Sequence, residues 1–147
     1  VVVLAFDDDG RIAFVRQWRS PVGGTTLELP AGLVEKDEDP AACAARELQE
    51  EVGLRPGSLE PLPGFYVAPG WTDEYLHGFL ARDCTFAPLP ADADERILVE
   101  NYSLGEAMDL IGEGAIIDAK SIVCLQAVAL RAVGALGAKV IRFYDGE

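Results

Sequence analysis

Three glutamates on one predicted helix could bind a metal ion. Glu47, Glu50 and Glu51 lie in a segment that begins at Asp39-Pro40 and ends at Gly53. With about 100° of rotation per residue, the two later glutamates fall within about 60° of Glu47, beside an apolar face. Like charges at these spacings repel each other unless a cation lies against them. Because no His or Cys accompanies these carboxylates, they suit a hard cation such as Mg²⁺ or Mn²⁺.

A solvated helix flank is the alternative interpretation of an E-x-x-E-E pattern, because glutamate is common on protein surfaces. The longer pattern around the helix decides between the two. Gly32 is followed after five residues by Glu38 and, after seven more, by the run Arg46-Glu47-Leu48-Gln49-Glu50-Glu51-Val52-Gly53-Leu54. At every fixed position this arrangement resembles the Nudix box, the loop-helix-loop signature of Nudix hydrolases.

The resemblance implies a role for each acid of the box. Glu47 and Glu51 would be the principal metal ligands, and Glu50 a further or water-mediated ligand. Glu38 would be a supporting acid. The implied reaction is hydrolysis of a nucleoside diphosphate linked to another group.

The other residues of the box have a physical logic of their own. Gly32 permits a backbone turn that aims the Ala31 carbonyl at the metal, and Gly53 ends the helix. Arg46 is placed to pair with a carboxylate such as Glu50 and orient it. We therefore count Arg46 and Glu50 among the catalytic groups and the Ala31 carbonyl among the metal ligands.

Motifs outside the box resemble one group of Nudix hydrolases, the ADP-ribose pyrophosphatases. Pro69 lies fifteen residues after Leu54, where that group carries a diagnostic proline. The other matching motifs are Arg16-Gln17-Trp18-Arg19, Leu27-Glu28-Leu29-Pro30-Ala31-Gly32 and Asp118-Ala119-Lys120-Ser121. The resemblance covers essentially the whole chain.

Candidate substrate contacts come from these motifs. Arg19 is expected to contact the phosphates, with Arg16 as the second candidate, against the alternative of ordinary surface arginines at a strand end. Glu28 and Glu74 are candidate acceptors for ribose hydroxyls, and Pro69 marks the substrate loop. Four aromatic residues would either stack on a purine or pack in the core: Trp18, Phe65, Tyr66 and Trp71.

A general base is expected on the acidic loop before the strand at 97–102. Attack of water on phosphorus needs such a base in addition to metal activation. Glu95 is our choice as base or additional metal ligand. Relatives often carry a second Glu two positions earlier, where this chain has Ala93, so Asp92 or Asp94 would substitute or Glu95 would act alone. A merely solvated acidic loop is the alternative.

Composition limits the partners. The 147 residues carry 12 Lys and Arg against 25 Asp and Glu, a net charge of −13, which disfavours nucleic-acid polymers and anionic membranes as partners. The three cysteines form no C-x-x-C pair, and we find no membrane segment or signal peptide, so we expect a cytoplasmic protein. The length fits a single domain spanning 1–147.

Strands and helices are expected to interleave irregularly, which predicts an α/β fold with a mixed β-sheet flanked by helices. The resemblance specifies this as the Nudix α/β/α sandwich. An Asp7–Gly10 turn should join the first two strands as a hairpin. Strands are expected over 1–6, 11–18, 25–29, 65–68, 75–82, 97–102 and 139–144, and helices over 40–52, 104–111 and 118–133, with 56–63 rich in turns.

The resemblance favours Mg²⁺-dependent hydrolysis of ADP-ribose to AMP and ribose 5-phosphate, with Mn²⁺ as the alternative ion. The box itself handles only the diphosphate, so another nucleotide sugar, NADH, FAD or a diadenosine polyphosphate remains an alternative substrate. A catalytically silent module that binds ADP-ribose is the alternative outside enzymes. The family also implies a homodimer, often with an N-terminal segment that precedes the position of Val1.

Overall fold

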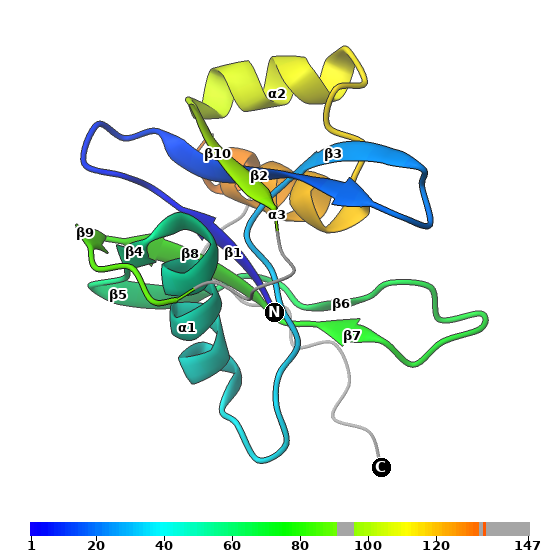
Figure 1. The fold of residues 1–147 in the computed structure, drawn as a ribbon. Helices are drawn as coiled ribbons and strands as arrows, with labels where there is room; N and C mark the ends of the chain where they lie inside the picture. The colour runs from blue at the N-terminus through cyan, green and yellow to red at the C-terminus, as the bar shows by residue number, and fades with distance from the viewer. Residues whose placement is uncertain (91–95, 133, 135–147) are drawn as a thin grey trace.

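The computed structural model describes residues 1–90, 96–132 and 134 (Figure 1). Its helices are α1 (Pro40–Val52), α2 (Leu104–Gly112) and α3 (Ala119–Ala132). Its strands are β1 (Val2–Ala5), β2 (Ile12–Arg19), β3 (Gly24–Glu28), β4 (Leu54–Arg55), β5 (Ser58–Pro61), β6 (Phe65–Tyr66), β7 (Tyr75–Leu76), β8 (Gly78–Arg82), β9 (Thr85–Phe86) and β10 (Ile97–Tyr102). The expected strand over 139–144 lies outside the described residues.

Two three-stranded sheets form the frame. The first has the order β1-β8-β5, in which β8 runs parallel to β1 and antiparallel to β5. The second has the order β10-β2-β3 and is antiparallel throughout. Strands β4 and β9 form a separate pair, and β6 and β7 form another. The expected mixed sheet is therefore confirmed in β1-β8-β5.

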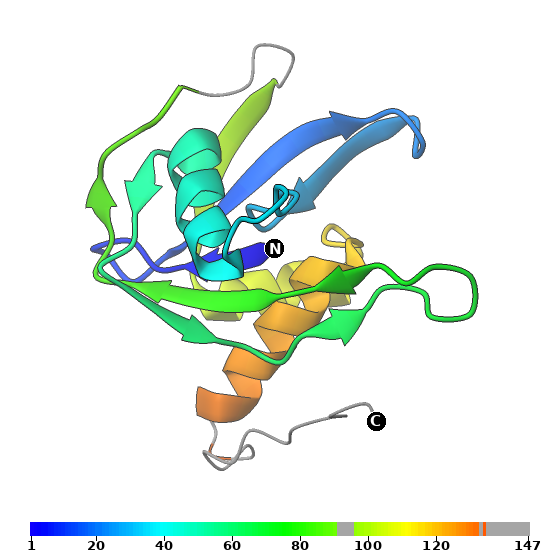
Figure 2. The same ribbon diagram turned by 90° about the horizontal axis from the view of Figure 1, so that it is seen from below.

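Strand β1 separates two apolar cores. Val3 and Ala5 pack with α1 through Leu48, whereas Val2 and Leu4 pack with residues of β2, β3 and α3. Figure 2 shows α1 and α3 on opposite sides of β8. This arrangement confirms the α/β/α sandwich.

Within the residues that the structure describes, none of the helices combines the length and the apolar character that crossing a membrane requires.

The expected hairpin between the first two strands is wrong. The chain does reverse at 7–10, where the Asp7 carboxylate accepts hydrogen bonds from the backbone of Asp9 and Arg11. Only one bridge, Phe6 to Ile12, joins the two strands. All four residues of β1 are fully buried, so both of its faces must be covered, and its partner is the parallel strand β8.

Helix ends follow the expected chemistry. The Asp39 side chain accepts hydrogen bonds from Ala41 and Ala42 at the start of α1, and Gly53 ends the helix in the left-handed region with φ 74°. Ser103 and Glu106 form a capping box at the start of α2. These signals are local, so they fix the helix ends independently of the tertiary fold.

Strand boundaries depart further from expectation. The segment 56–63 contains β5, and the expected strand over 75–82 is divided at His77 into β7 and β8. The expected strand over 65–68 shortens to the two residues of β6. Sheet pairing sets these limits, because β5 gains its partner only from β8.

A buried serine ties the end of β3 to α3. The Ser121 hydroxyl accepts a hydrogen bond of 2.7 Å from the Leu29 backbone N–H and donates one to Asp118. Ser121 does not cap α3, because Asp118 accepts from the Ser121 backbone N–H and takes that role. The contact fixes the chain just before Pro30-Ala31.

We predict that Ser121→Ala destabilises the protein by about 1–3 kcal/mol, because it leaves the buried Leu29 N–H without its acceptor. Urea unfolding measures the loss. The matched control is Ser20→Ala, since Ser20 is exposed. Equal unfolding free energies for the two variants would contradict the role of Ser121 as an anchor.

Candidate active site

The Ala31-Gly32 segment lies between β1 and α1. The Val3 backbone N–H donates to the Pro30 carbonyl at 2.8 Å, and Val2 forms an isolated bridge with Ala31. On the other side, the Ala31 N–H donates to Glu51 Oε2 at 2.9 Å. The backbone is thereby joined to a strand and to the carboxylate helix at the same point.

Gly32 gives the Glu47 carboxylate the space it occupies. A Cβ built on Gly32 would lie 1.9 Å from Glu47 Cδ and 2.1 Å from its Oε1, far inside van der Waals contact. Gly32 is not among the residues with positive φ, so a left-handed turn does not explain the glycine. The requirement is close approach between backbone and side chain.

One guanidinium holds three carboxylates of this site. Arg46 Nη1 lies 2.7 Å from Glu47 Oε1 and 2.8 Å from Glu50 Oε2, and Arg46 Nε lies 3.0 Å from Glu38 Oε1. The expected pairing of Arg46 with Glu50 is present. Hydrogen bonds from Arg46 and from the Glu35 backbone lower the pKa of Glu38 to about 2, and those same carboxylates raise the pKa of Arg46. Glu38 therefore remains ionised at neutral pH.

The donor set fits a hard divalent cation. Glu47, Glu50 and Glu51 lie on one face of α1, and Glu51 is buried beside Ala31. Among the described residues, no three His, Cys, Asp or Glu side chains converge on one point that a metal ion would fill. Arg46 lies between Glu47 and Glu50 in this arrangement and supplies their positive charge. Glu95, the expected base, lies outside the described residues.

A second charged cluster is built around the buried carboxylate of Glu28. It accepts two hydrogen bonds from Arg19, at 2.8 and 2.7 Å, and further ones from Lys120 and Thr26. Burial opposes ionisation of Glu28, but these hydrogen bonds outweigh it and lower its pKa to about 2. Asp118 pairs with Lys120 at 3.0 Å.

This Glu28 cluster lines a cavity of about 390 Å³. The walls are formed by the ends of β2 and β3 and the start of α3, and they comprise Arg19, Pro21, Val22, Thr26, Glu28, Ile117, Asp118, Ala119 and Lys120. Two cations and two carboxylates therefore border one space. Lys120 belongs to the 118–121 motif, but no role in the site was predicted for it. A signal was available, because a cation in the first turn of a helix opposes the helix dipole and needs a compensating acid.

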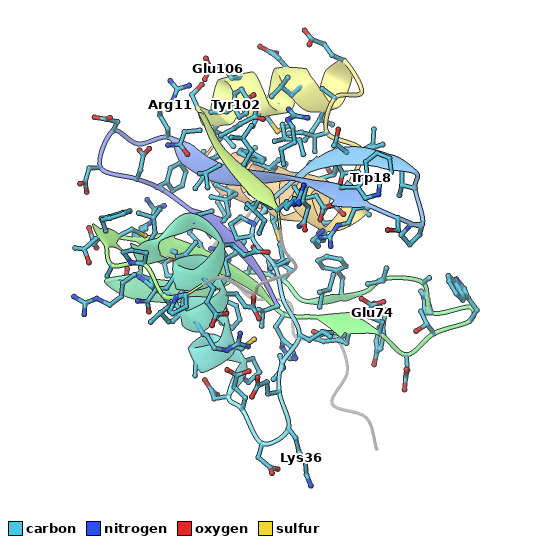
Figure 3. The ribbon with its side chains drawn as sticks, in the orientation of Figure 1. Arg11, Trp18, Lys36, Glu74, Tyr102 and Glu106 are labelled. Atoms are coloured by element: carbon cyan, nitrogen blue, oxygen red, sulfur yellow. The ribbon has the colours of Figure 1, made fainter. Side chains whose placement is uncertain are left out.

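The structure does not bring Arg16 and Arg19 together. Side chains alternate along β2, so Arg16 lies on the opposite face from Arg19 and pairs with Glu100. Glu74 and Pro69 belong to the hairpin of β6 and β7, which projects from the body of the molecule (Figures 1 and 3). Both are exposed, and their roles toward substrate stay predictions.

The four aromatic candidates divide by exposure. Phe65 is half-buried and packs against the larger core. Trp18, labelled in Figure 3, is 60% exposed, and Tyr66 and Trp71 are also exposed. Core packing therefore accounts for Phe65 alone.

We predict that Glu28→Gln lowers stability near neutral pH and that the difference from wild type narrows in acid. The folded carboxyl has a pKa of about 2 against an ordinary 4.5, so its contribution is complete above about pH 4.5 and is lost as pH falls toward 2. The side chain is only 4% exposed, so solvent screens its interactions little. The difference between the folded and the ordinary pKa then corresponds to at most about 3 kcal/mol of stability.

Urea unfolding across the acid range tests this pH dependence. The control is Glu60→Gln, because Glu60 is 55% exposed and its ion pairs are long, at 3.9 Å. If stability of Glu28→Gln and wild type changed in parallel with pH, the buried ion cluster would not be the source of the effect.

Known proteins resemble this chain over most of its length. The ADP-ribose pyrophosphatase of Bacillus subtilis (strain 168) is 38% identical over 133 residues, which cover 89% of this chain and 72% of that protein. The ADP-ribose pyrophosphatase of Mycobacterium tuberculosis is 35% identical over 131 residues, 87% of this chain and 63% of that protein. The GDP-mannose pyrophosphatase of Cronobacter sakazakii is 32% identical over 141 residues, 90% and 73% of the two chains.

A comparison with solved structures and a comparison with family models give consistent results. A crystal structure of an ADP compounds hydrolase superposes with a TM-score of 0.82 at 24% identity, covering 92% of this chain and 74% of that chain, which shows the shared fold. The family model of the NUDIX domain matches residues 1–122, the part that contains the Ala31-Gly32 segment, the carboxylates of α1 and the Glu28 cluster. The chain therefore belongs to the Nudix family.

Proposed function

We propose that this chain hydrolyses the diphosphate of a nucleoside diphosphate linked to another group, with ADP-ribose, cleaved to AMP and ribose 5-phosphate, as its main substrate. The observation that carries the proposal is the contact of the α1 carboxylates with the Ala31-Gly32 backbone. The two ADP-ribose pyrophosphatases among the relatives support ADP-ribose. The GDP-mannose pyrophosphatases among them support another nucleotide sugar as the second candidate.

Nudix hydrolases generally use divalent metal ions, and we propose Mg²⁺, with Mn²⁺ as the alternative. Glu47, Glu51 and the Ala31 carbonyl would hold the ion, and Glu50 would be a further ligand. When bound, such an ion polarises a phosphoryl oxygen and lowers the pKa of a water molecule. Glu95 is proposed to accept the proton of the attacking water.

Arg46 acts as a positioning residue for these acids. Its guanidinium keeps Glu38, Glu47 and Glu50 close together, although three like charges would otherwise repel each other. The three carboxylates are therefore held close together before a metal ion binds. This arrangement reduces the reorganisation that forming a metal site would otherwise require.

Arg19 is proposed to bind the diphosphate. Glu28 engages its Nε and Nη2, and Nη1 has no hydrogen-bond partner among the described residues. The two hydrogen bonds to Glu28 therefore fix the plane of the Arg19 guanidinium and leave Nη1 for a phosphate oxygen. With its oxygens bound to Arg19, Thr26 and Lys120, Glu28 is better suited to positioning Arg19 than to receiving a ribose hydroxyl.

Homodimerisation also remains part of the proposal and rests on the family resemblance. Arg16, Glu74 and Pro69 stay candidate substrate contacts. Of these, Arg16 requires that its ion pair with Glu100 be shared or broken, because Nε and Nη2 are both engaged.

The test is a product assay with ADP-ribose, GDP-mannose, NADH, FAD and a diadenosine polyphosphate, each with Mg²⁺, Mn²⁺ or EDTA. We expect metal-dependent AMP from ADP-ribose at a higher kcat/KM than any other substrate gives. We expect Glu51→Gln to lower kcat by more than about a hundredfold, because it removes a metal-binding charge.

The matched control is Glu113→Gln, which changes an exposed acid after α2 and should keep wild-type activity. Thermal unfolding checks that both variants fold. A higher kcat/KM for another substrate would contradict the proposal that ADP-ribose is the main substrate. Full activity of a folded Glu51→Gln would contradict the proposed metal site. Tight binding of ADP-ribose without turnover of any substrate would indicate a binding module instead.

A further inference from the structure

Gln17 lies on the face of β2 that carries Arg19. In the sheet register Gln17 is directly opposite Thr26 of β3 and Ile97 of β10. Opposed residues share a face, and so do residues two apart on one strand. Arg19 and Thr26 are therefore its neighbours on this face, and both line the cavity beside Glu28.

The side chain of Gln17 is buried except at its amide. The residue is only 8% exposed. Its amide makes no hydrogen bond with the part of the chain that the structure describes, and that part contains no fully buried polar side-chain atom without a partner. The amide of Gln17 must therefore reach open space, while the stem of the side chain is packed.

Packing alone does not explain a glutamine at this position. The preceding residues on the same face, Ala13 and Val15, are apolar and buried. The amide of Gln17 gives the packed stem no hydrogen bond within the described part of the chain, so an apolar side chain would serve a purely structural position at least as well. Gln49 shows the contrasting case, because its amide donates to the Ala87 carbonyl at 2.7 Å and joins α1 to the segment after β9.

Gln17 does not itself line the cavity, but its neighbours Arg19 and Thr26 do, so the charges around the cavity are the nearest ones to its amide. Arg19 and Lys120 are balanced there by Glu28 and Asp118, in a chain of net charge −13. An anionic ligand at this face needs donors that bring no further negative charge. A neutral N–H donor with an open tip meets that need and can bond a phosphate oxygen.

We propose that the Gln17 side-chain amide donates a hydrogen bond to a non-bridging oxygen of the substrate diphosphate, on the same face as the Arg19 guanidinium. This inference rests on the proposed function. It assigns Gln17 as a direct phosphate contact and gives a reason for a polar residue next to the apolar Ala13 and Val15 on this face of β2.

The test compares Gln17→Leu and Gln17→Glu with wild type. Loss of one hydrogen bond to a charged oxygen should lower kcat/KM of Gln17→Leu for ADP-ribose about ten- to hundredfold. The affinity for an α,β-methylene analogue of ADP-ribose, measured by calorimetry, should fall by a similar factor. Gln17→Glu should lose more, because its carboxylate would face the phosphates.

The control is Gln126→Leu, because Gln126 is exposed on α3, away from the cavity. Thermal unfolding shows whether a variant has misfolded or has only lost the contact with phosphate. Because the Gln17 amide has no hydrogen bond to lose within the described part of the chain, the melting temperature of Gln17→Leu should be no lower than that of wild type. Analogue affinity and kcat/KM within twofold of wild type would overturn the inference. If wild type turns over no substrate, the proposed function fails, and the calorimetry still tests Gln17 as a phosphate contact.

Discussion

Close approach between the Gly32 backbone and the Glu47 carboxylate is the constraint on which the candidate site depends. The approach exists because the Ala31-Gly32 segment is joined to β1 by backbone pairing and to α1 by the hydrogen bond from Ala31 to Glu51. A side chain at position 32 would have to displace the carboxylate. The same contact therefore connects the fold, through β1 and its two cores, with the acids that define the chemistry.

Concentrating carboxylates on one helix face is unfavourable unless cations compensate, and the chain supplies them from its own residues. Arg46 joins Glu38, Glu47 and Glu50, while Glu28 is surrounded by donors from β2, β3 and α3. The two clusters have opposite charge at their centres. In the first, one cation gathers several acids, which we propose as metal ligands. In the second, one buried acid orients cations, which we propose to face an anionic substrate. In the proposed function, these two arrangements together allow an acidic protein to bind a diphosphate.

Local signals in the sequence predicted the parts of the structure that depend on neighbouring residues. Asp39, Gly53 and Ser103 fix helix ends through contacts within a few residues, so they were predictable. The pairing of β1 with β8 was not, because it depends on burial of both faces of β1 across more than seventy residues of sequence. The pairing of Lys120 with Glu28 was not predicted, because the two residues are distant in the chain, although the place of Lys120 in the first turn of a helix indicates that it needs an acid. The motif placed the acids of α1 on one face, but it predicted a backbone turn as the reason for Gly32, whereas the structure gives close approach of the Glu47 carboxylate.

The central claim is that the Ala31-Gly32 backbone and the α1 carboxylates form one metal site. Calorimetric titration of Mn²⁺ into wild type and Gly32→Ala tests it most directly, with thermal unfolding as the check on folding. Because the added methyl group displaces the Glu47 carboxylate, binding should weaken by at least about tenfold while the protein stays folded. Equal Mn²⁺ affinity in the two proteins would contradict the account.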